Sequence, residues 1–600
     1  MQSPKFPSKR ADIEGVINAS ALRSRWRDKV RDAMRKQPIP DPVEHLDFHT
    51  SLDALCKGIA AEISSGQYTP RPPIRYLSEK SKGLCRQLVI PSVKDALVLQ
   101  TLSDALWVEL RTKAPSKNAF YAPNDQRFSQ AIRGYTDEYG PINLWLSFQT
   151  AILGFATTKK YVVVTDIANY YDFISYDHLR NILSDLAIVR EHSLDLLLYT
   201  LSHMLWQPDY MPRVQIGLPQ IPFLDAPRLL AHCFLFEIDR LLSDRPHTDF
   251  ARYMDDIDVG VDTIPDAKVV LRDLDLSLQT RQIRLNSGKT LILSDTEARR
   301  HFRIRDNALL DRLEDQIISK IGRGADISRE RRFIERFISV GLTSHRFEGG
   351  NGDKILRRCI NYARRYGAVL GDTDLLRLLL KWPTARSPAL QWWQHSASPG
   401  TQLELIRDFV RSNEIIDDAS FIDVSIALVS AKLPRSVKTW RLIEDICKHL
   451  DDENVWVLYS KLWILSKYGT EDEVMQLIET RLPVWITEEQ ASRLVGGMYS
   501  RFVGSLQFPK FRAIIQRSGN QGSRDVFDFY DALVTTSSGF RAVLKFMRTP
   551  NPSFPNRISH AKFLMVRAGA HNTAVPAAIP SLIRTHSRAL QDEYYRALTP

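Results

Sequence analysis

The spacing of hydrophobic and polar residues divides this chain of 600 residues into regions of different character. Between about residues 161 and 305, short apolar runs of strand length alternate with segments of helical spacing. Lys160–Thr165 (KYVVVT) predicts a buried strand, and Ala251–Val261 predicts a hairpin because apolar and polar residues alternate along its second half. Helices are expected over Tyr176–Leu186, Pro227–Leu242 and Pro265–Gln279. This alternation predicts a sheet covered by helices.

The regions on either side are mainly helical in pattern. Residues 41–160 show helical spacing over Leu52–Ile63 and Lys94–Leu110, around a proline-rich elbow at residues 70–73. After about residue 306, amphipathic segments follow one another to the end, and we expect Trp456, Trp463 and Tyr468 to be core residues there. This succession predicts an irregular α-solenoid without a repeat of fixed period. The expected units are 1–40, 41–160, 161–305, 306–400 and 401–600.

Composition narrows the class of protein. The chain is too long for one ordinary domain, and 44% hydrophobic with 25% charged residues is typical of a globular protein. No apolar run approaches the roughly 20 residues of a membrane helix, and the first residues lack the apolar stretch of a secretion signal. Five widely spaced cysteines, without a CxxC pair, predict neither a zinc site nor a disulfide framework. We therefore expect a cytoplasmic protein with no membrane partner.

The net charge of +11 favours an anionic partner. Residues 1–40 form a basic N-terminal arm, with ten Lys and Arg against four Asp and Glu, and basic residues stand at alternate positions from Arg23 to Arg31. Two interpretations stay open for this arm. It could bind a phosphate backbone, because clustered cations release counterions there, or it could simply be solvated.

The sequence Tyr253-Met254-Asp255-Asp256 lies at the centre of the expected hairpin. Two adjacent carboxylates at a hairpin tip should be little buried, and because like charges repel, they need a cation or an exposed turn. A solvated turn would explain them without any function. Asp166 favours a functional interpretation over a solvated turn, because it directly follows the buried strand and could lie close to Asp255 and Asp256. Three carboxylates provide the hard oxygen ligands that two Mg²⁺ ions require.

Five motifs, in order, resemble those of reverse transcriptases. The palm motifs A to D of that family are similar to DIANYY from Asp166, GLPQ from Gly217, YMDD from Tyr253 and LNSGKT from Leu285. Upstream, RQLVIP from Arg86, followed by Asp95 and Gln100, is similar to the fingers motif of the prokaryotic branch, which includes retron, group II intron and defence enzymes.

The resemblance covers roughly residues 75–295, about a third of the chain. It implies an α+β right-hand polymerase fold, with fingers over 41–160 and a palm over 161–305. A thumb-like helical region over 306–400 and an all-α, solenoid-like C-terminal domain over 401–600 would follow.

The resemblance also implies a catalytic and metal-binding set. Its members would be Asp166, Ile167, Asp255 and Asp256 as the metal site, with Lys289 near the leaving pyrophosphate as a positive partner or proton donor. For Lys289, a cation at a helix end is the alternative. The implied cofactor is a pair of Mg²⁺ ions, with Mn²⁺ as a substitute. Positioning and charge neutralisation would carry the rate.

A second implied set binds the substrate. Arg86, with Lys80 or Lys82, would hold the triphosphate, although either lysine could merely be solvated. The remaining members would be Tyr171, a gate against the ribose 2′-hydroxyl, Gln220, which contacts the nucleotide and the template side, and Tyr253 and Met254. The implied partners are therefore dNTPs and nucleic acid, as an RNA template or non-coding RNA and a DNA product.

Two residues depart from the usual family pattern, and a third leaves open whether the product is RNA or DNA. Asp172 fits the spacing by which viral RNA polymerases sense a ribose hydroxyl, although the aromatic Tyr171 favours DNA synthesis. GLPQ continues with Ile221 where Gly is usual, and Asp225 stands where a small Ser is usual. Because a β-branched residue cannot readily take positive φ, ordinary processive copying of a long template is in doubt.

A reverse-transcriptase core joined to a long helical half resembles the phage-defence reverse transcriptases, the Abi and defence-associated (DRT) group. This implies antiviral function, assembly as a homo-oligomer or with a second defence component, and unusual priming or templating. Tyr594 and Tyr595 are accessible in principle as priming hydroxyls, but we expect them to face solvent without a role. The alternatives are a retron-like or intron-like enzyme that copies a defined RNA, and a catalytically silent nucleic-acid-binding scaffold.

Overall fold

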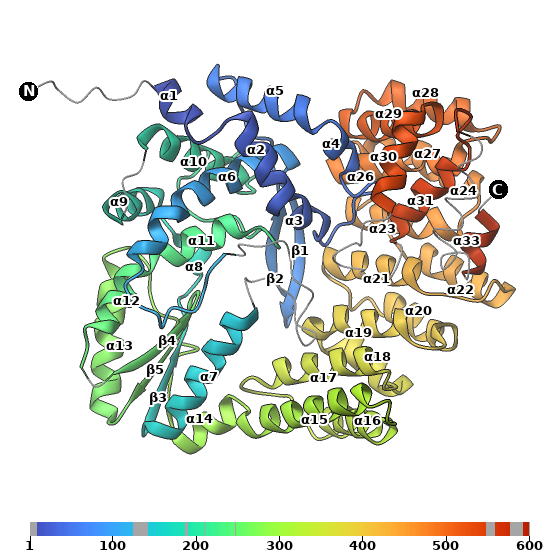
Figure 1. The fold of residues 1–600 in the computed structure, drawn as a ribbon. Helices are drawn as coiled ribbons and strands as arrows, with labels where there is room; N and C mark the ends of the chain where they lie inside the picture. Colours follow the sequence, from blue (N-terminus) through green and yellow to red (C-terminus); the bar gives the residue numbers. More distant parts are fainter. Residues whose placement is uncertain are drawn as a thin grey trace, which may run out of the picture.

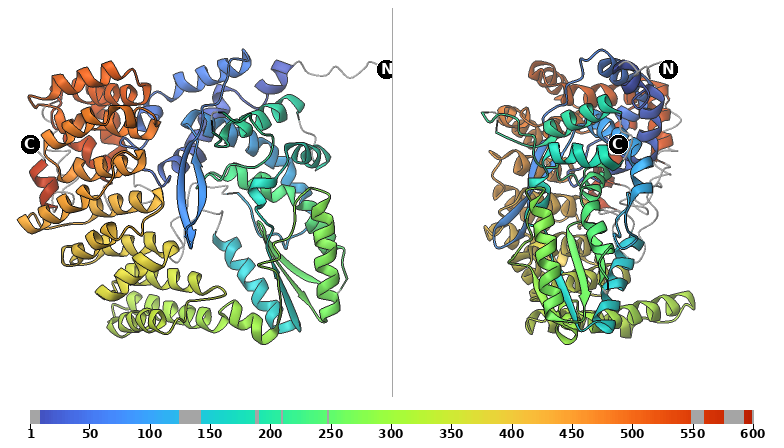
Figure 2. Two further views of the ribbon diagram at one scale, coloured as in Figure 1. Left: turned by 180° about the vertical axis from the view of Figure 1, so that it is seen from behind. Right: turned by 90° about the vertical axis from the view of Figure 1, so that its left-hand side faces the viewer.

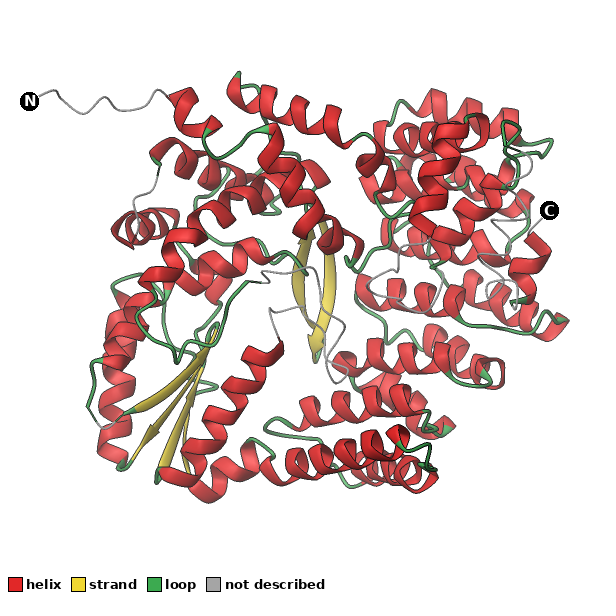
Figure 3. Cartoon of the chain, in the orientation of Figure 1, coloured by secondary structure: helices red, strands yellow, loops and turns green. Residues whose placement is uncertain are grey.

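The structure is a computed structural model, and it describes residues 9–123, 142–186, 190–208, 210–246, 248–547, 559–575 and 592–598. Helices form most of it, and Figure 3 shows that the strands are confined to two places. In Figure 1 a four-stranded sheet with its helices lies at the lower left, helices of the C-terminal half fill the right, and a two-stranded hairpin stands between them. Figure 2 shows the same hairpin from behind.

The larger sheet has the strand order β4-β5-β3-β6 and is antiparallel throughout. Its strands are β3 (Tyr161–Thr165), β4 (Asp249–Tyr253), β5 (Asp256–Val261) and β6 (Leu291–Ser294). Helices α7 (Ile142–Thr158) and α13 (Ile264–Gln279) both pack on it, on opposite sides in Figure 1. Gly260 lets α7 come close, since a Cβ there would lie 2.8 Å from Lys159 Cγ and 3.2 Å from Phe155.

The smaller sheet is the hairpin of β1 (Ile74–Ser81) and β2 (Leu84–Ile90). Its pairing shifts between Glu79 and Ser81, so that Lys80 is the extra residue of a β-bulge. Bulges redirect side chains and bend the strand that carries them. Lys82 (φ 53°) and Gly83 (φ 80°) form the turn that follows.

The helices of the first half surround these sheets. They are α1 (Lys9–Glu14), α2 (Ala19–Arg25), the π-helix η1 (Trp26–Val30), α3 (Arg31–Arg35), α4 (Leu46–Thr50), α5 (Leu52–Ser64), α6 (Val93–Leu110), the 3₁₀-helix η2 (Arg111–Lys113), α8 (Tyr170–Phe173), α9 (Tyr176–Leu186), α10 (Glu191–Met204), α11 (Asp225–Phe234), α12 (Phe236–Ser243) and α14 (Asp295–His301). The single helix predicted over Pro227–Leu242 is wrong. Leu235, at φ −95° and ψ 10°, leaves helical geometry and separates α11 from α12.

The helices of the second half follow one another as an irregular stack (Figure 1). They are α15 (Ile304–Gly322), α16 (Ser328–Thr343), α17 (Gly352–Tyr366), α18 (Asp372–Lys381), α19 (Pro383–His395), η4 (Pro399–Gln402), α20 (Leu403–Arg411), α21 (Asp418–Ser430), α22 (Val437–Lys448), α23 (Val455–Tyr468), α24 (Glu471–Thr480), α25 (Leu482–Trp485), α26 (Glu489–Gly497), α27 (Tyr499–Phe502), α28 (Phe508–Ser518), α29 (Gln521–Thr535), α30 (Ser537–Met547), α31 (His560–Gly569) and α33 (Glu593–Leu598). The predicted core residues Trp456, Trp463 and Tyr468 are buried. No helix among the described residues combines the length and apolar character needed to cross a membrane.

The basic N-terminal stretch is not a free arm over its described part. Residues 9–14 and 19–35 form helices, in which Trp26 and Val30 are fully buried. Arg25 and Lys29 both form ion pairs with Asp104 of α6. In the part of this stretch that the structure describes, these two cations therefore make contacts within the chain.

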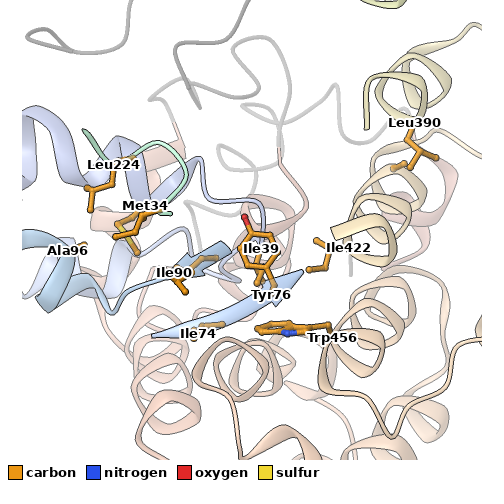
Figure 4. Packing of buried hydrophobic residues seen from close by; sticks show 14 of the residues in the cluster. Met34, Ile39, Ile74, Tyr76, Ile90, Ala96, Leu224, Leu390, Ile422 and Trp456 are labelled. Atoms are coloured by element: carbon orange, nitrogen blue, oxygen red, sulfur yellow. The ribbon is translucent and has the colours of Figure 1, made fainter. Parts of the chain in front are cut away.

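The two halves share one continuous hydrophobic core. Figure 4 shows Ile74 and Tyr76 of β1 packed near Ile422 of α21 and Trp456 of α23. Tyr76 is fully buried, although a two-stranded hairpin on its own cannot bury its side chains. The helices of the second half therefore complete the core around the hairpin.

Tyr594 and Tyr595 also lie in this core, contrary to expectation. Their exposed fractions are 8% and 7%. The Tyr595 ring stacks on Phe563 at 3.8 Å, and its hydroxyl donates to the carbonyl oxygen of Val429 at 3.3 Å. The accessibility expected from their place near the end of the chain is wrong, because α33 packs against α23.

Candidate active site

The turn between β4 and β5 carries the two adjacent carboxylates. Tyr253 and Asp256 form the last strand pair, which leaves Met254 and Asp255 as a two-residue turn. Met254 has a φ of 58°, a left-handed conformation that costs a residue with a side chain about 1 kcal/mol or more. Such a turn persists only where its surroundings hold it in place.

A buried ion pair holds this turn. The Arg252 guanidinium donates from Nε to Asp239 Oδ1 at 2.6 Å and from Nη2 to Oδ2 at 2.5 Å, and neither side chain is exposed. Its third nitrogen, Nη1, donates to the carbonyl oxygen of Met254 at 3.0 Å. Arg252 therefore fixes the peptide that precedes Asp255.

Aromatic side chains support the same turn from behind. The Tyr253 ring contacts Trp145, Phe148 and Tyr121, at centroid distances of 5.1, 5.7 and 6.4 Å. Tyr253 and Met254 are buried, with 7% and 5% exposed. Tyr253 and Met254, both predicted to bind substrate, thus pack inside the protein at the turn.

Asp166 lies beside this turn on the neighbouring strand. Thr165 pairs with Ile257 in the antiparallel β3–β5 ladder, so the register continued by one residue sets Asp166 opposite Asp256. Side chains opposite each other across antiparallel strands have Cβ atoms about 5 Å apart. The strand order thus brings together carboxylates that are far apart in the sequence.

The LNSGKT segment runs along Asp166 and its neighbours. The Asn286 amide donates to the Asp166 carbonyl oxygen at 2.7 Å, and Ile167 forms an isolated bridge with Leu285. The side chain of Ile167 is buried. From the same segment, the Lys289 ammonium forms an ion pair with the Asp166 carboxylate. Lys289 therefore lies at the carboxylates and not at a helix end, with its side chain still partly exposed to solvent.

The three carboxylates influence one another strongly. Desolvation, then the neighbouring Asp256 and Asp166, raises the pKa of Asp255 to about 7. Desolvation also raises the pKa of Asp256, with Asp166 adding to it and Lys354, Lys289 and Lys80 opposing it. The expected tip of low burial is therefore wrong for Asp255, which is half-buried and closely surrounded by protein.

Lys80 of the β1–β2 hairpin lies near these carboxylates, and Arg86 lies near Lys80. Desolvation, followed by the nearby Lys289 and Arg86 charges, lowers the pKa of Lys80, while Asp166 and Asp255 act in the opposite direction. Lys80 is the bulged residue of β1, and Arg86 stands on β2 opposite Ser78. The structure thus brings together two of the three residues predicted to hold a triphosphate, whereas Lys82 occupies the exposed turn.

The GLPQ segment connects the hairpin to the region of Tyr171. Gly217 (φ 99°) donates its amide to the Ile174 carbonyl oxygen at 2.9 Å, and Leu218 donates to that of Tyr171 at 2.7 Å. The carbonyl oxygen of Gln220 accepts from the Val89 amide of β2 at 3.1 Å. Tyr171 itself is half-buried against Tyr170, at a centroid distance of 5.8 Å.

Two residues of the fingers motif have structural roles. The buried Asp95 carboxylate accepts from the Tyr68 hydroxyl at 2.8 Å and the Arg71 amide at 2.9 Å. Gln100 Oε1 accepts from the Ala226 amide at the start of α11 at 3.1 Å. These contacts fix α6 against its neighbours, away from any reacting group.

Sequence reasoning missed three contributors. Arg252 and Asp239 form the buried pair beneath the turn, and an arginine between Ala251 and Tyr253 in a strand leading to the turn is a signal that could have revealed it. Lys354 of α17 lies 5.0 Å from the Trp145 ring centroid, and its charge opposes the rise in pKa that burial causes at Asp256 and at Asp258. No local pattern distinguishes Lys354 from the many other cations of its region.

The donor set has the chemistry of a magnesium site, although its side chains are not gathered around an ion. Among the described residues, no three His, Cys, Asp or Glu side chains form a cluster ready to hold a metal. The Lys289 ammonium instead pairs with Asp166. Carboxylate oxygens are nonetheless the ligands that Mg²⁺ prefers, and it needs only one or two from the protein. Desolvation first, and then repulsion from neighbouring carboxylates, raises the pKa of Asp255 and of Asp256, and a bound cation would favour their charged forms.

Comparison with known proteins gives little beyond this geometry. No protein-family model and no curated protein matches the chain. Among solved structures it is similar to telomerase from Candida albicans in complex with a TWJ fragment of telomeric RNA, at 10% identity and a TM-score of 0.28 over 63% of this chain and 62% of that one. Apo telomerase from Candida tropicalis matches at 10% identity and a TM-score of 0.26 over 78% and 74% of the two chains.

A third similar structure is telomerase from Candida tropicalis in complex with a TWJ fragment, at 12% identity and a TM-score of 0.28 over 66% and 68%. The chain thus spans less than two thirds of the first of these structures. Similarities of this size carry no argument. The functional interpretation therefore rests on the strand register and the side chains described above.

Proposed function

We propose that this protein is a metal-dependent polymerase of the reverse-transcriptase type, which adds deoxynucleotides to a 3′-hydroxyl or to a protein hydroxyl. The observation that supports it most is the register that sets Asp166 opposite Asp256, next to Asp255. A carboxylate at a strand end and a carboxylate pair in the adjacent hairpin are the arrangement that its sequence motifs imply.

The proposed cofactor is Mg²⁺, with Mn²⁺ as a substitute. Asp166, Asp255 and Asp256 would hold it through their carboxylates, and Ile167, whose side chain is apolar, could add only its main-chain carbonyl. When bound, a pair of such ions activates the attacking hydroxyl and neutralises charge on the phosphates.

The cations of the chain would bind the triphosphate. Lys80 lies near Asp166 and Asp255, and Arg86 lies near Lys80, so a nucleotide held there would meet positive charge from the hairpin and the acidic turn opposite it. Arginine holds phosphate oxygens in a fixed two-pronged geometry, whereas lysine contributes a point charge. Lys289 neutralises Asp166 in the free chain and would turn to the leaving pyrophosphate once substrate enters.

Tyr171 would select the sugar. Its ring is partly fixed by Tyr170, and its carbonyl oxygen is held by the Leu218 amide, so its position is defined before substrate arrives. A fixed aromatic ring beside the sugar would leave no room for a 2′-hydroxyl, which favours dNTPs over rNTPs. Catalysis by this chain would then consist mainly of orientation and charge placement.

The biological setting that we propose is antiphage defence in a bacterial cytoplasm, with an oligomer or a second defence component as partner. Its support is the layout of motifs followed by a long helical half. Priming from Tyr594 or Tyr595 would need α33 to undock, because both residues are buried.

Incorporation of labelled dNTPs by the purified full chain tests the enzymatic proposal. We expect incorporation with Mg²⁺ or Mn²⁺, and at least a thousandfold loss in Asp255→Asn, because the metal-binding charge is removed. Asp262→Asn, an exposed carboxylate just beyond β5, is the matched control and should retain activity. Equal activity of Asp255→Asn and the wild type would contradict the site.

Sequencing of copurifying nucleic acid, with a protease treatment, separates the proposed mode from its alternatives. A DNA homopolymer or short DNA repeat that stays attached to the protein until protease treatment indicates that synthesis is primed by the protein. A long cDNA complementary to one RNA indicates a retron-like or intron-like enzyme. No incorporation under any template condition, with unchanged phage protection in Asp255→Asn, indicates a silent scaffold.

A further inference from the structure

The outer edge of β1 is covered by helices from the other half of the chain. β1 pairs with β2 along one edge only, which leaves a row of peptide groups along the other. Unpaired strand edges attract foreign strands, and an isolated two-stranded hairpin is marginally stable at best. The partners of this edge therefore decide whether the hairpin keeps its shape.

Side chains take the place of a third strand. The amide of Leu77 donates to Asp418 Oδ2 at 2.8 Å, and that of Glu79 donates to Asp417 Oδ2 at 3.1 Å. The carbonyl oxygen of Arg75 accepts from the Trp456 indole nitrogen at 3.0 Å. Residues 75, 77 and 79 alternate along β1, as groups that point from one strand edge must.

An arginine of the same half fixes the end of the hairpin. Arg386 of α19 is 2% exposed at its side chain and donates from Nη1 to Glu79 Oε2 at 2.6 Å. The other oxygen of Glu79 accepts from the Gly83 amide in the turn at 3.1 Å. Glu79 thus links Arg386 to both sides of the bulged Lys80. Asp417 completes the cluster, with its Oδ1 3.4 Å from Arg386 Nη1.

From these contacts we propose that the helical C-terminal half positions the triphosphate-binding cations. Asp417, Asp418, Trp456 and Arg386 act as positioning residues: they hold β1, and through it Lys80 and Arg86, at the distance from Asp166 and Asp255 that substrate requires. This assignment rests on the function proposed above for those cations. It gives the second half a defined task in a reaction whose reacting groups all lie in the first half.

The strongest test removes two hydrogen bonds with little change in packing. Trp456→Phe keeps an aromatic ring in the core but loses the indole N–H, and Asp418→Ala removes the acceptor of Leu77. Asp418 is preferable to Asp417, because Asp417 also caps α21 by accepting from the Ser420 amide at 3.2 Å.

Matched controls lie on the same or a neighbouring helix. Trp463→Phe changes a second buried indole of α23, whose nitrogen has no hydrogen-bond partner among the described residues. Asp408→Ala removes an exposed carboxylate of α20 that pairs with its neighbour Arg407. Both should leave the hairpin as it is in the wild type.

Hydrogen exchange of peptides covering residues 74–81 measures the hairpin directly and needs no activity. In the double variant Trp456→Phe/Asp418→Ala we expect exchange to be about tenfold faster or more, with peptides from β3 and β5 unchanged, because each lost bond contributes a factor of several. Neither control should accelerate it. Unchanged exchange in a folded double variant would overturn the proposal.

Steady-state incorporation then tests the functional half of the proposal. We expect the double variant to raise KM for dNTP roughly fivefold to tenfold while kcat stays within about twofold, because the carboxylates themselves are not disturbed. A looser hairpin with an unaltered KM would overturn the positioning role. A wild-type protein without any incorporation would contradict the proposed function alone, and hydrogen exchange would still decide whether the second half holds the hairpin.

Discussion

The two sheets of this molecule achieve their shape in different ways. The four-stranded sheet obtains its partners locally: α7, α13 and α14 pack on it, and the ion pair beneath its acidic turn joins Arg252 to Asp239, only 13 residues away. The β1–β2 hairpin depends on partners more than 300 residues distant, since Leu77 is bound by Asp418.

The negative and the positive groups of the proposed site therefore stand on differently supported sheets. The carboxylates lie on a scaffold that supports itself, with a strained residue at Met254 held in place by a buried guanidinium. The cations stand on a hairpin whose outer edge belongs to another part of the chain. A self-supporting scaffold suits groups whose relative positions must be kept to within about 0.5 Å, whereas a braced one allows remote helices to influence substrate binding.

Asp239→Ala should have the largest effect, and it acts on the self-supporting sheet. It leaves the Arg252 charge buried without its partner, which costs about 3–5 kcal/mol. Thermal unfolding followed by circular dichroism measures the loss. Asp244→Ala, an exposed residue just beyond the same helix, should melt with the wild type. An unchanged melting temperature for Asp239→Ala would mean that local partners do not carry this sheet.

Tyr171→Ala should have the next largest effect, on the choice of sugar rather than on stability. Removing the ring opens space for a 2′-hydroxyl, so discrimination against ribonucleotides should fall by roughly tenfold to a hundredfold. Competition between a dNTP and its rNTP measures the ratio. Phe173→Ala, an exposed aromatic of the same short helix, is the control. Unchanged selectivity would remove the gate assignment.

Arg86→Ala tests the cationic side of the comparison. The loss of one charge-assisted contact to phosphate should raise KM for dNTP by about tenfold, without any change in melting temperature, because Arg86 is exposed and buries no core. The control is Arg111→Ala, an exposed cation beyond α6. A dNTP requirement equal to that of the wild type would make Arg86 a merely solvated residue.

A last effect is a dependence of stability on pH, which arises in α21, the helix that braces β1. Burial raises the pKa of Asp423 in α21 from 3.8 to about 7, while the Ser387 hydroxyl acts in the opposite direction. Because the folded protein binds this proton more tightly than the unfolded chain, the carboxyl favours folding below pH 4 and loses that contribution as pH rises towards 7. Asp423→Asn should therefore be stabilising relative to the wild type at pH 8 and close to neutral at pH 4.

Melting temperatures of the two proteins at both pH values check this expectation. Asp408→Asn, an exposed carboxylate, should show no such difference between the two conditions. A gap between Asp423→Asn and wild type that is the same at pH 4 and pH 8 would contradict a titrating buried carboxyl.

The self-supporting sheet was the more predictable of the two. Strand β3 and helix α9 run almost where hydrophobic spacing places them, because a run of valines and an amphipathic stripe carry their own signals. Strand β1 (IRYLSEKS) has no such pattern, and neither does the short β6. Their pairing partners, rather than their own residues, make them strands, and partners at long range leave no local trace.

The candidate site divides in the same way. The carboxylates and Lys289 belong to motifs with a recognisable order, and the structure brings them into contact or register. The burial of Asp255 and the contribution of Lys354 depend on packing that sequence spacing does not encode. Tyr594 shows the same limit: nearness to the chain end indicated exposure, yet α33 docks on α23.

The core shared between β1 and the helices α21 and α23 constrains how such a chain can be cut or recombined. A fragment that stops after β6 would leave Ile74 and Tyr76 without cover and the peptide edge of β1 in water, so the first half would fold poorly on its own. Transplanting the helical half between related chains would likewise fail unless the hairpin residues that meet it travel with it. Hairpin and helices thus form one structural module, although hundreds of residues lie between them.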